Sequence, residues 1–384
     1  MQAGGLRYGG GHSAVFSKQP MNALDCLILA DDLTGACDAA AVFARRGRRT
    51  SVPLSADWCL ARAEVIALNT ETRDAAPQEI HRQVAAAAQC AAALRPHTIF
   101  KKIDSTLRGQ AGVEIVAAME AFGCEAALMC PAFPKMNRTV EAGWLRVAGG
   151  GKFAPVEIVA YLRAQGVGGC AHAAVEGVEE ALAAGAKLIA LDAACDDDLD
   201  RIAAAGAATG RRILWVGSAG LAGALARRLA VSGTAAKMVR PAGPVLFCIG
   251  SDHAATLAQQ AALVRERRAR LVETRVEIRA ALEDGAHALL RIPRGRFRAA
   301  ELWDLLAGAP AAALALSGGD TASLVCRAAG AERIDLDGEI LPGVPCGAIR
   351  GGGFDGMAVA TKSGGFGGED ALIEVADYFT CPNR

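Results

Sequence analysis

The chain has 384 residues, with 41 basic and 41 acidic side chains and therefore no formal net charge. This balance argues against a general surface for nucleic acids or anionic membranes, and no apolar run reaches the roughly 18 residues of a membrane span. A chain of this length is expected to form two domains. The 12 cysteines form no C-x-x-C pair and no metal-ligand spacing, which indicates reduced thiols in a cytoplasmic protein.

The chain begins with a glycine-rich segment and then a strand–helix unit that carries two acids. Residues 1–21 lack periodicity and an apolar core, so we predict a disordered extension that is not a signal peptide. A buried strand is predicted at 24–30, and a helix over about 36–46, with Asp31 and Asp32 between them. We expect one acid to accept ligand hydroxyls and the other to cap the helix; in the alternative, both merely orient the turn.

The next two predicted strands also end in polar residues. Strand 65–69 is followed by Arg73, and an alanine-rich helix is predicted at 77–94. The following strand ends at Phe100, before a helix at 113–122, and the residues between them are Lys101, Lys102, Ile103, Asp104, Ser105, Thr106, Leu107, Arg108 and Gly109. Ligands of open α/β sheets bind outside the carboxyl ends of strands. Cations beside hydroxyls suit a small anionic, hydroxylated ligand such as a sugar acid, whereas a solvated loop with a capping side chain is the alternative.

The rest of the first half alternates between helix and strand signals. A proline-rich loop over 131–139 follows a strand at 126–129, and residues 143–153 are predicted to form a hairpin or lid with the glycines 149–151 at its turn. The run from Gly217 to Gly220 is interpreted as a close-packing turn more than as a phosphate loop. The other predicted elements are 156–165, 176–184, 188–192, 197–208, 213–216 and a helix to about 229.

The second half carries glycine-rich turns before helices. Residues 231–244 break the pattern and are expected to link a domain at 22–236 to one at 243–384. Its predicted elements are strands 245–249, 288–292, 312–316 and 357–361, and helices 254–270, 299–306, 320–329 and 369–378. The Ser317–Thr321 turn and the run from Lys362 to Gly368 each follow a strand. Glycine lets backbone approach a ligand, and a helix N-terminus favours anions, so both are candidate phosphate cradles; no Walker motif is present.

Six motifs in order resemble the four-carbon acid sugar kinase family over about residues 24–378. They are Ala30–Ala36, Asn69–Arg73, Lys101–Gly109, Ser317–Thr321, Pro342–Pro345 and Lys362–Gly367. The resemblance implies two three-layer α/β/α domains with a cleft between them, the first binding a tetronate and the second binding ATP. Family members phosphorylate D-threonate, D-erythronate or 3-oxo-tetronates, typically on the terminal C4 hydroxyl. The Lys101–Gly109 segment is more similar to the D-threonate and D-erythronate kinases.

The resemblance also implies site residues, carried over position by position. The sugar acid would be bound by Asp31, Asp32, Arg73, Lys101, Lys102, Ile103, Asp104 and Ser105. As a separate hypothesis about the mechanism, we expect Asp32 to be the catalytic residue that orients the hydroxyl. ATP would be bound by Ser251, Gly318, Gly319, Asp320, Thr321, Ser363, Gly364 and Gly365. The same hypothesis places Mg²⁺ on the ATP phosphates, with Asp320 as its ligand directly or through water. Two features depart from the family: His253 replaces a small hydroxyl residue, and the chain is short around 275–298. The partners are small molecules, and a homodimer is the assembly considered.

Three other functions are compatible with parts of the sequence. A 3-oxo-tetronate kinase of the same family would use the same site. An NAD-dependent oxidoreductase would also need a sugar-acid site, but no G-x-G-x-x-G follows the first strand. A non-catalytic sensor would bind the sugar acid without consuming ATP, and the two glycine-rich turns argue against it.

Overall fold

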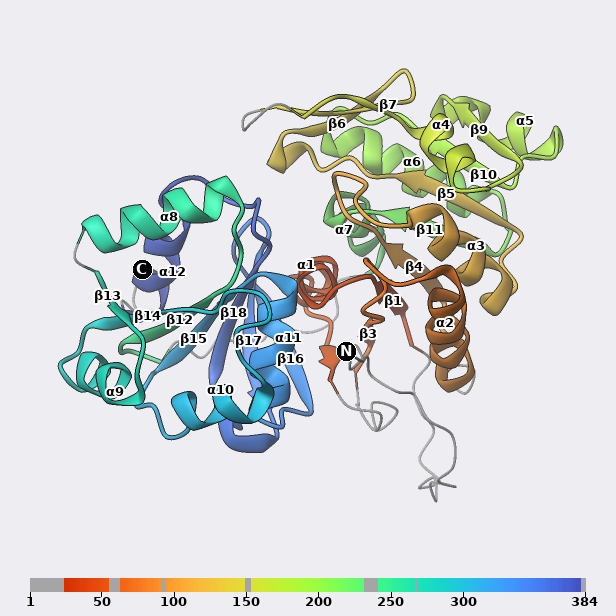
Figure 1. Cartoon of the computed structure of the whole chain (residues 1–384). Coiled ribbons are helices and arrows are strands. Elements are labelled where there is room, and N and C mark those ends of the chain that lie inside the picture. Colours follow the sequence, from red (N-terminus) through yellow and green to blue (C-terminus); the bar gives the residue numbers. More distant parts are fainter. Residues whose placement is uncertain are drawn as a thin grey trace.

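The computed structural model describes residues 24–54, 63–91, 94–148, 153–230, 241–266 and 268–380 (Figure 1). The predicted extension at 1–21, the glycines 149–151 and most of the predicted linker lie outside these ranges. The chain is α/β, as predicted, and two α/β halves lie side by side with helix α1 between them (Figure 1). Within the described ranges, no cysteine forms a disulfide, and no helix is both long and apolar enough to span a bilayer.

The first half is a parallel sheet in the order β2-β3-β1-β4-β11-β5-β10-β9, with a small separate sheet β6-β7-β8. Helices α1, α6 and α7 pack together, as do α2 and α3. Its elements are β1 (Cys26–Ala30), α1 (Leu33–Ala44), β2 (Thr50–Pro53), β3 (Val65–Asn69), α2 (Pro77–Ala91), β4 (Thr98–Lys102), α3 (Ala111–Phe122), β5 (Ala126–Cys130), β6 (Arg138–Glu141), β7 (Trp144–Val147), β8 (Val156–Glu157), α4 (Ile158–Ala164), β9 (Cys170–Ala173), α5 (Val178–Ala183), β10 (Leu188–Leu191), α6 (Asp196–Ala208), β11 (Ile213–Gly217) and α7 (Ala219–Arg228).

The second half is a sheet in the order β13-β14-β12-β15-β18-β17-β16, in which β16 and β17 form an antiparallel hairpin. Helices α9, α10 and α11 pack in sequence, and α8 packs on α12. Its elements are β12 (Val245–Ile249), α8 (Ala254–Arg265), β13 (Ala269–Val272), α9 (Arg275–Glu283), β14 (His287–Arg291), α10 (Ala299–Leu306), β15 (Ala313–Ser317), α11 (Gly319–Ala328), β16 (Arg333–Leu341), β17 (Val344–Arg350), β18 (Ala358–Lys362) and α12 (Ala371–Thr380).

Three predictions about local structure were wrong. Both lysines at 101 and 102 belong to β4 and not to the loop after it. The helix predicted at 254–270 ends at Arg265, because a short strand, β13, begins at Ala269. Strands β16 and β17 flank the predicted proline turn, and Pro345 is tolerated in β17 because it lies at a register shift and outside the pairing with β18. The hairpin predicted at 143–153 is present, by contrast: β7 pairs antiparallel with β8, and residues 149–151 come between these two strands in the sequence.

Strand β2, which the sequence did not predict, joins the two halves. It pairs in parallel with β3 and antiparallel with β16, so that 15 strands form one continuous sheet. The Ser51 hydroxyl donates to Asp335 Oδ1 at 3.1 Å, and Arg333 and Arg350 also donate to the Asp335 carboxylate. The halves are therefore connected by backbone hydrogen bonds in addition to the covalent chain.

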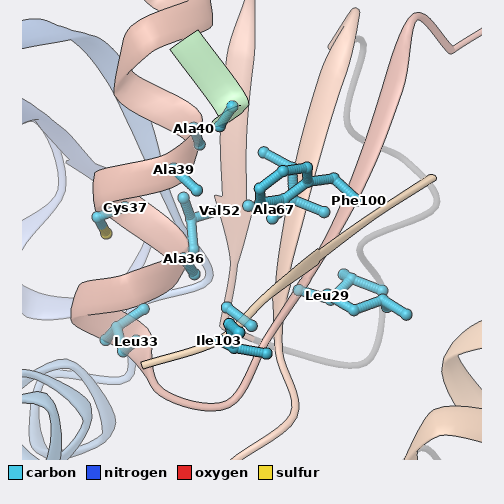
Figure 2. Packing of buried hydrophobic residues seen from close by; sticks show 14 of the residues in the cluster. Leu29, Leu33, Ala36, Cys37, Ala39, Ala40, Val52, Ala67, Phe100 and Ile103 are labelled. Atoms are coloured by element: carbon cyan, nitrogen blue, oxygen red, sulfur yellow. The ribbon is translucent and has the colours of Figure 1, made fainter. Parts of the chain in front are cut away.

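Helix α1 is buried almost throughout because it packs on strands of both halves. Ala36, Ala39 and Ala40 allow it to lie close to the first sheet, where Val52 and Phe100 face it (Figure 2). This packing fixes the position of the helix N-terminus, where Asp32 is the cap residue. The turn before α7 is a packing turn, as interpreted: a Cβ on Gly217 would lie 2.4 Å from the carbonyl oxygen of Cys130.

Replacing Gly347 by alanine should weaken the hairpin that joins the halves. A Cβ there would lie 2.0 Å from the carbonyl oxygen of Asp335, so the β16–β17 backbone would have to move. We expect a loss of about 1–3 kcal/mol in unfolding free energy, seen as a fall of several degrees in Tm. Gly168→Ala is the matched control, because a Cβ at Gly168 meets no atom within 4 Å. Equal Tm values for the two variants would contradict the expectation.

Candidate active site

Three carboxylates and one arginine meet at the carboxyl ends of β1, β3 and β4. Arg73 Nε and Nη2 donate to both oxygens of Asp31, at 2.7 and 2.9 Å, and Arg73 Nη1 donates to Asp32 Oδ2 at 2.6 Å. Asp104 lies 3.8 Å from the same guanidinium and also pairs with Arg108. The structure therefore brings together four of the predicted residues, Asp31, Asp32, Arg73 and Asp104. The negative charges of the three carboxylates and the positive charge of the guanidinium stabilise one another.

Asp32 caps helix α1 and is held ionised. Its Oδ1 accepts from the Gly35 amide at 2.6 Å, and its Oδ2 accepts from the Thr34 hydroxyl at 3.1 Å. Burial alone would raise the pKa of Asp32, but Arg73, Lys102 and the Gly35 amide lower it below its ordinary value. A carboxylate that stays charged is suited to accepting a hydrogen bond from a hydroxyl group.

The two lysines of β4 point to opposite faces of the sheet, because side chains alternate along a strand. Lys101 is 0% exposed and forms an ion pair of 3.3 Å with Glu114 on α3. Lys102 lies on the side of α1: a Cβ on Gly35 would lie 3.1 Å from its ammonium nitrogen. Lys102 is thus the lysine whose charge lies beside Asp32.

The remaining residues predicted for the sugar acid surround this cluster. Ile103 is buried, and its amide donates to the carbonyl of Gly217 at 3.0 Å, which fixes the end of β4. Ser105 is also buried. Asp104 accepts from the Thr106 amide at 2.9 Å, so this carboxylate shapes the loop that Ser105 belongs to.

The residues predicted for ATP also come together, at the carboxyl ends of β12, β15 and β18. A Cβ on Gly250 would lie 2.1 Å from Thr321 Oγ1, and a Cβ on Gly364 would lie 2.1 Å from Ser251 Oγ. Gly318 has a φ of 104°, which a side chain would strain. Nδ1 of His253 accepts a hydrogen bond from the Ala255 amide at 3.2 Å, so His253 caps the N-terminus of α8. A small hydroxyl residue commonly has this capping role.

The two groups of residues touch each other. A Cβ on Gly319 would lie 2.6 Å from Asp32 Oδ2, so only glycine permits this approach. The hydroxyls of Thr34 and Ser363 are 3.1 Å apart. Phe366, in the loop after β18, packs edge-on against Phe133 of the first half at a centroid distance of 6.0 Å. The predicted sugar-acid and nucleotide residues thus form one continuous site.

Asp320 lies at the edge of this site. Its carboxylate is 75% exposed and lies 3.3 Å from Arg294 Nε. Among the described residues, no group of three or more His, Cys, Asp or Glu side chains could hold a metal ion. A magnesium ion that is held mainly by nucleotide phosphates and water would need only one or two carboxylates from the protein, and Asp320 could supply one.

Asp38 was missed by the sequence analysis, although it lies on α1, the helix that Asp32 caps. It is 2% exposed on α1, and its Oδ1 has no hydrogen-bond partner among the described residues. Burial raises the pKa of Asp38 to about 7; Lys102 and Arg138 oppose this rise, whereas Glu339 and Asp32 add to it. The sequence could have indicated Asp38 only through its position on the helix that begins at Asp32.

The stability of the protein should depend on the ionisation of Asp38. Its pKa is about 7 in the folded chain and about 3.9 in an unfolded one, so the folded state binds the extra proton. The contribution of Asp38 to the unfolding free energy is therefore fully present below about pH 4 and is lost as the pH rises toward 7.

Asp38→Asn removes this loss, so its Tm should rise relative to that of the native chain between pH 5 and pH 8. Thermal unfolding at both pH values measures the difference. Asp197→Asn, which removes an exposed carboxylate from α6, is the control. A Tm difference between Asp38→Asn and the native chain that is the same at pH 5 and pH 8 would refute the prediction.

Two family models match the two halves of the chain. A family model described as a sugar-binding N-terminal domain matches residues 26–157 and 152–225, and one described as a nucleotide-binding C-terminal domain matches residues 296–372. A D-threonate kinase of Bordetella bronchiseptica is 36% identical, covering 91% of this chain and 96% of that protein. A D-erythronate kinase of Heliobacterium modesticaldum is 29% identical, covering 92% of this chain and 96% of that protein.

The fold also has a solved counterpart. A crystal structure from Salmonella typhimurium, described as a putative tRNA synthase, has a TM-score of 0.72 at 21% identity and covers 92% of this chain and 98% of that one. At this identity the likeness concerns the fold alone. On the family models and the sequence identity, the chain belongs to the four-carbon acid sugar kinase family.

Proposed function

We propose that the chain is an ATP-dependent kinase that phosphorylates D-threonate or D-erythronate on the terminal C4 hydroxyl, in the cytoplasm. The observation that carries the proposal is the contact between Asp32 and Gly319. It brings the charged cluster of the first half against the glycine turn of the second half, where a hydroxyl and a terminal phosphate would have to meet for transfer.

The charged cluster supports binding of a short hydroxylated carboxylate. Arg73 can present a planar pair of donors to the substrate carboxylate, and Lys102 adds a second positive charge. In the absence of substrate, Asp31 and Asp32 occupy the Arg73 donors. Substrate binding would exchange some of these bonds, which frees Asp32 to accept a bond from the attacking hydroxyl. Because the pKa of Asp32 is lowered, its carboxylate is a weak base. It is therefore better suited to orienting the attacking hydroxyl than to taking up the proton of that hydroxyl.

The glycine turns support nucleotide binding. The phosphates would be contacted on one side by Ser251, Gly318, Gly319 and Thr321 and on the other side by the segment Ser363–Gly365. The two domains would exclude water from the site. Mg²⁺, which neutralises developing charge on the phosphates, would be held by Asp320 together with the nucleotide. We further propose a homodimer, which light scattering after gel filtration would test.

The choice of substrate needs a direct test. A coupled ATP-consumption assay with D- and L-threonate, D- and L-erythronate and 3-oxo-tetronates separates the candidates. Turnover of D-threonate or D-erythronate supports the proposal, and exclusive turnover of a 3-oxo acid would favour the family alternative. Binding of a sugar acid without consumption of ATP would favour a sensor.

Asp32→Asn should reduce kcat by about 10²- to 10⁴-fold, because the amide cannot accept and orient the hydroxyl as a carboxylate does. The fold should persist, since an asparagine also caps a helix. Steady-state kinetics and circular dichroism measure the two effects, and Asp197→Asn is the control. Near-native turnover in the Asp32 variant would remove this residue from the mechanism.

A further inference from the structure

Strand β18 ends on a lysine that has no acidic partner among the described residues. Lys362 is 3% exposed. Its ammonium donates only to uncharged oxygens: Thr256 Oγ1 at 3.2 Å, and the carbonyls of Ser363, Gly364 and Phe366 at 3.0, 3.4 and 3.3 Å. Burial lowers the pKa of Lys362 to about 7. A buried charge without a counter-charge is costly, and a bound anion beside Lys362 would reduce this cost.

Two side chains of helix α8 also donate hydrogen bonds to carbonyl groups of the loop 363–368 that follows Lys362. Gln259 Nε2 donates to the carbonyls of Phe366, Gly367 and Gly368 at 2.9, 3.1 and 2.8 Å. Thr256 Oγ1 donates to the carbonyl of Gly364 at 2.6 Å. Thr256 and Gln259 are both 0% exposed. Together with Lys362, these buried donors turn five carbonyl groups of the loop 363–368 toward the interior.

The direction of the loop amides follows from this arrangement. A trans peptide directs its N–H away from its C=O, and the described residues contain no cis peptide. The amides of Gly364 and Gly365 therefore point away from Lys362, and they donate to no group of the described residues. Ser251 and His253 adjoin these two glycines. Successive outward amides of this kind form an anion-binding concavity.

We propose that Lys362, Gln259 and Thr256 are positioning residues that shape the loop 363–368 to receive the terminal phosphates of the nucleotide. They act through the loop carbonyls and touch no phosphate themselves. The inference rests on the proposed function, because it assumes that the second half binds ATP. The bound phosphates would then supply the negative charge that Lys362 lacks, so nucleotide binding and protonation of Lys362 strengthen each other.

This coupling has a measurable sign. Binding raises the pKa of Lys362, so the protein takes up protons when it binds nucleotide near pH 7, and affinity falls as pH rises above 7. The other charged groups around the loop are His253, Arg108 and Arg138, and Glu369, which pairs with Arg265. Burial and the nearby cations lower the pKa of His253 from its ordinary value, and the variant His253→Gln isolates the share of proton uptake that this imidazole contributes.

The test is isothermal titration of the full chain with a non-hydrolysable ATP analogue and Mg²⁺, from pH 6 to pH 9, in buffers of different ionisation enthalpy. Lys362→Met should weaken binding by about tenfold or more and abolish the part of the proton uptake that the native chain shows beyond the nucleotide's own. KM for the sugar acid should stay unchanged. Lys187→Met, an exposed lysine of the first half, is the matched control.

The outcomes separate the inference from the function on which it rests. Native affinity and native proton uptake in Lys362→Met would overturn the inference. A native chain that binds no analogue at all would overturn the proposed function. If Lys362→Met does not fold, Gln259→Met decides: weakened analogue binding with retained proton uptake supports the inference, and unchanged binding refutes it.

Discussion

The antiparallel pairing of β2 with β16 is the constraint on which the site depends. It reverses the strand direction between the two halves, since β16, β17 and β18 also alternate. Strands β1 and β15 are six steps apart in the sheet, which in a flat sheet would separate them by about 29 Å at ~4.8 Å a step. Yet Asp32, after β1, touches Gly319, after β15. The sheet must therefore curl around α1, which packs on both halves.

Charge is distributed unevenly over the site that this curl creates. The first half supplies Asp31, Asp32 and Asp104, all bound to Arg73 or close to it, and keeps a second pair, Lys101 with Glu114, on the other face of the sheet. The second half supplies backbone amides and one buried ammonium. Ion pairs hold the first half in place without a ligand. In the second half, Lys362 has no acidic partner among the described residues, and in our proposal the bound phosphates supply the missing negative charge.

Much of the site was predictable because parallel strands bring their carboxyl ends to one edge. Asp32, Arg73, Gly318 and Gly364 each follow a strand, so spacing along the chain was enough to group them within their own halves. The contact between the halves was not predictable, because β2 is short and β16 and β17 surround a proline turn that reads as a loop. No local signal in either segment reports a partner strand nearly 300 residues away.

Side-chain direction was the second limit. Lys101 and Lys102 look equivalent in the sequence. Because β4 extends through both residues, their side chains point to opposite faces of the sheet, one toward Glu114 and the other toward Asp32. Asp38 was missed for a related reason: its burial depends on α1 being covered from two sides, which follows from the curl of the sheet. Periodicity within the helix carries no information about that second cover.

The shared sheet also limits how the two halves can be treated as modules. Severing the chain between β11 and β12 would leave β2 in one fragment and β16 in the other, each with a row of bare peptide groups, and such bare edges promote self-association. Grafting the nucleotide half of another kinase onto this sugar-acid half would succeed only if the β2–β16 register travelled with the graft.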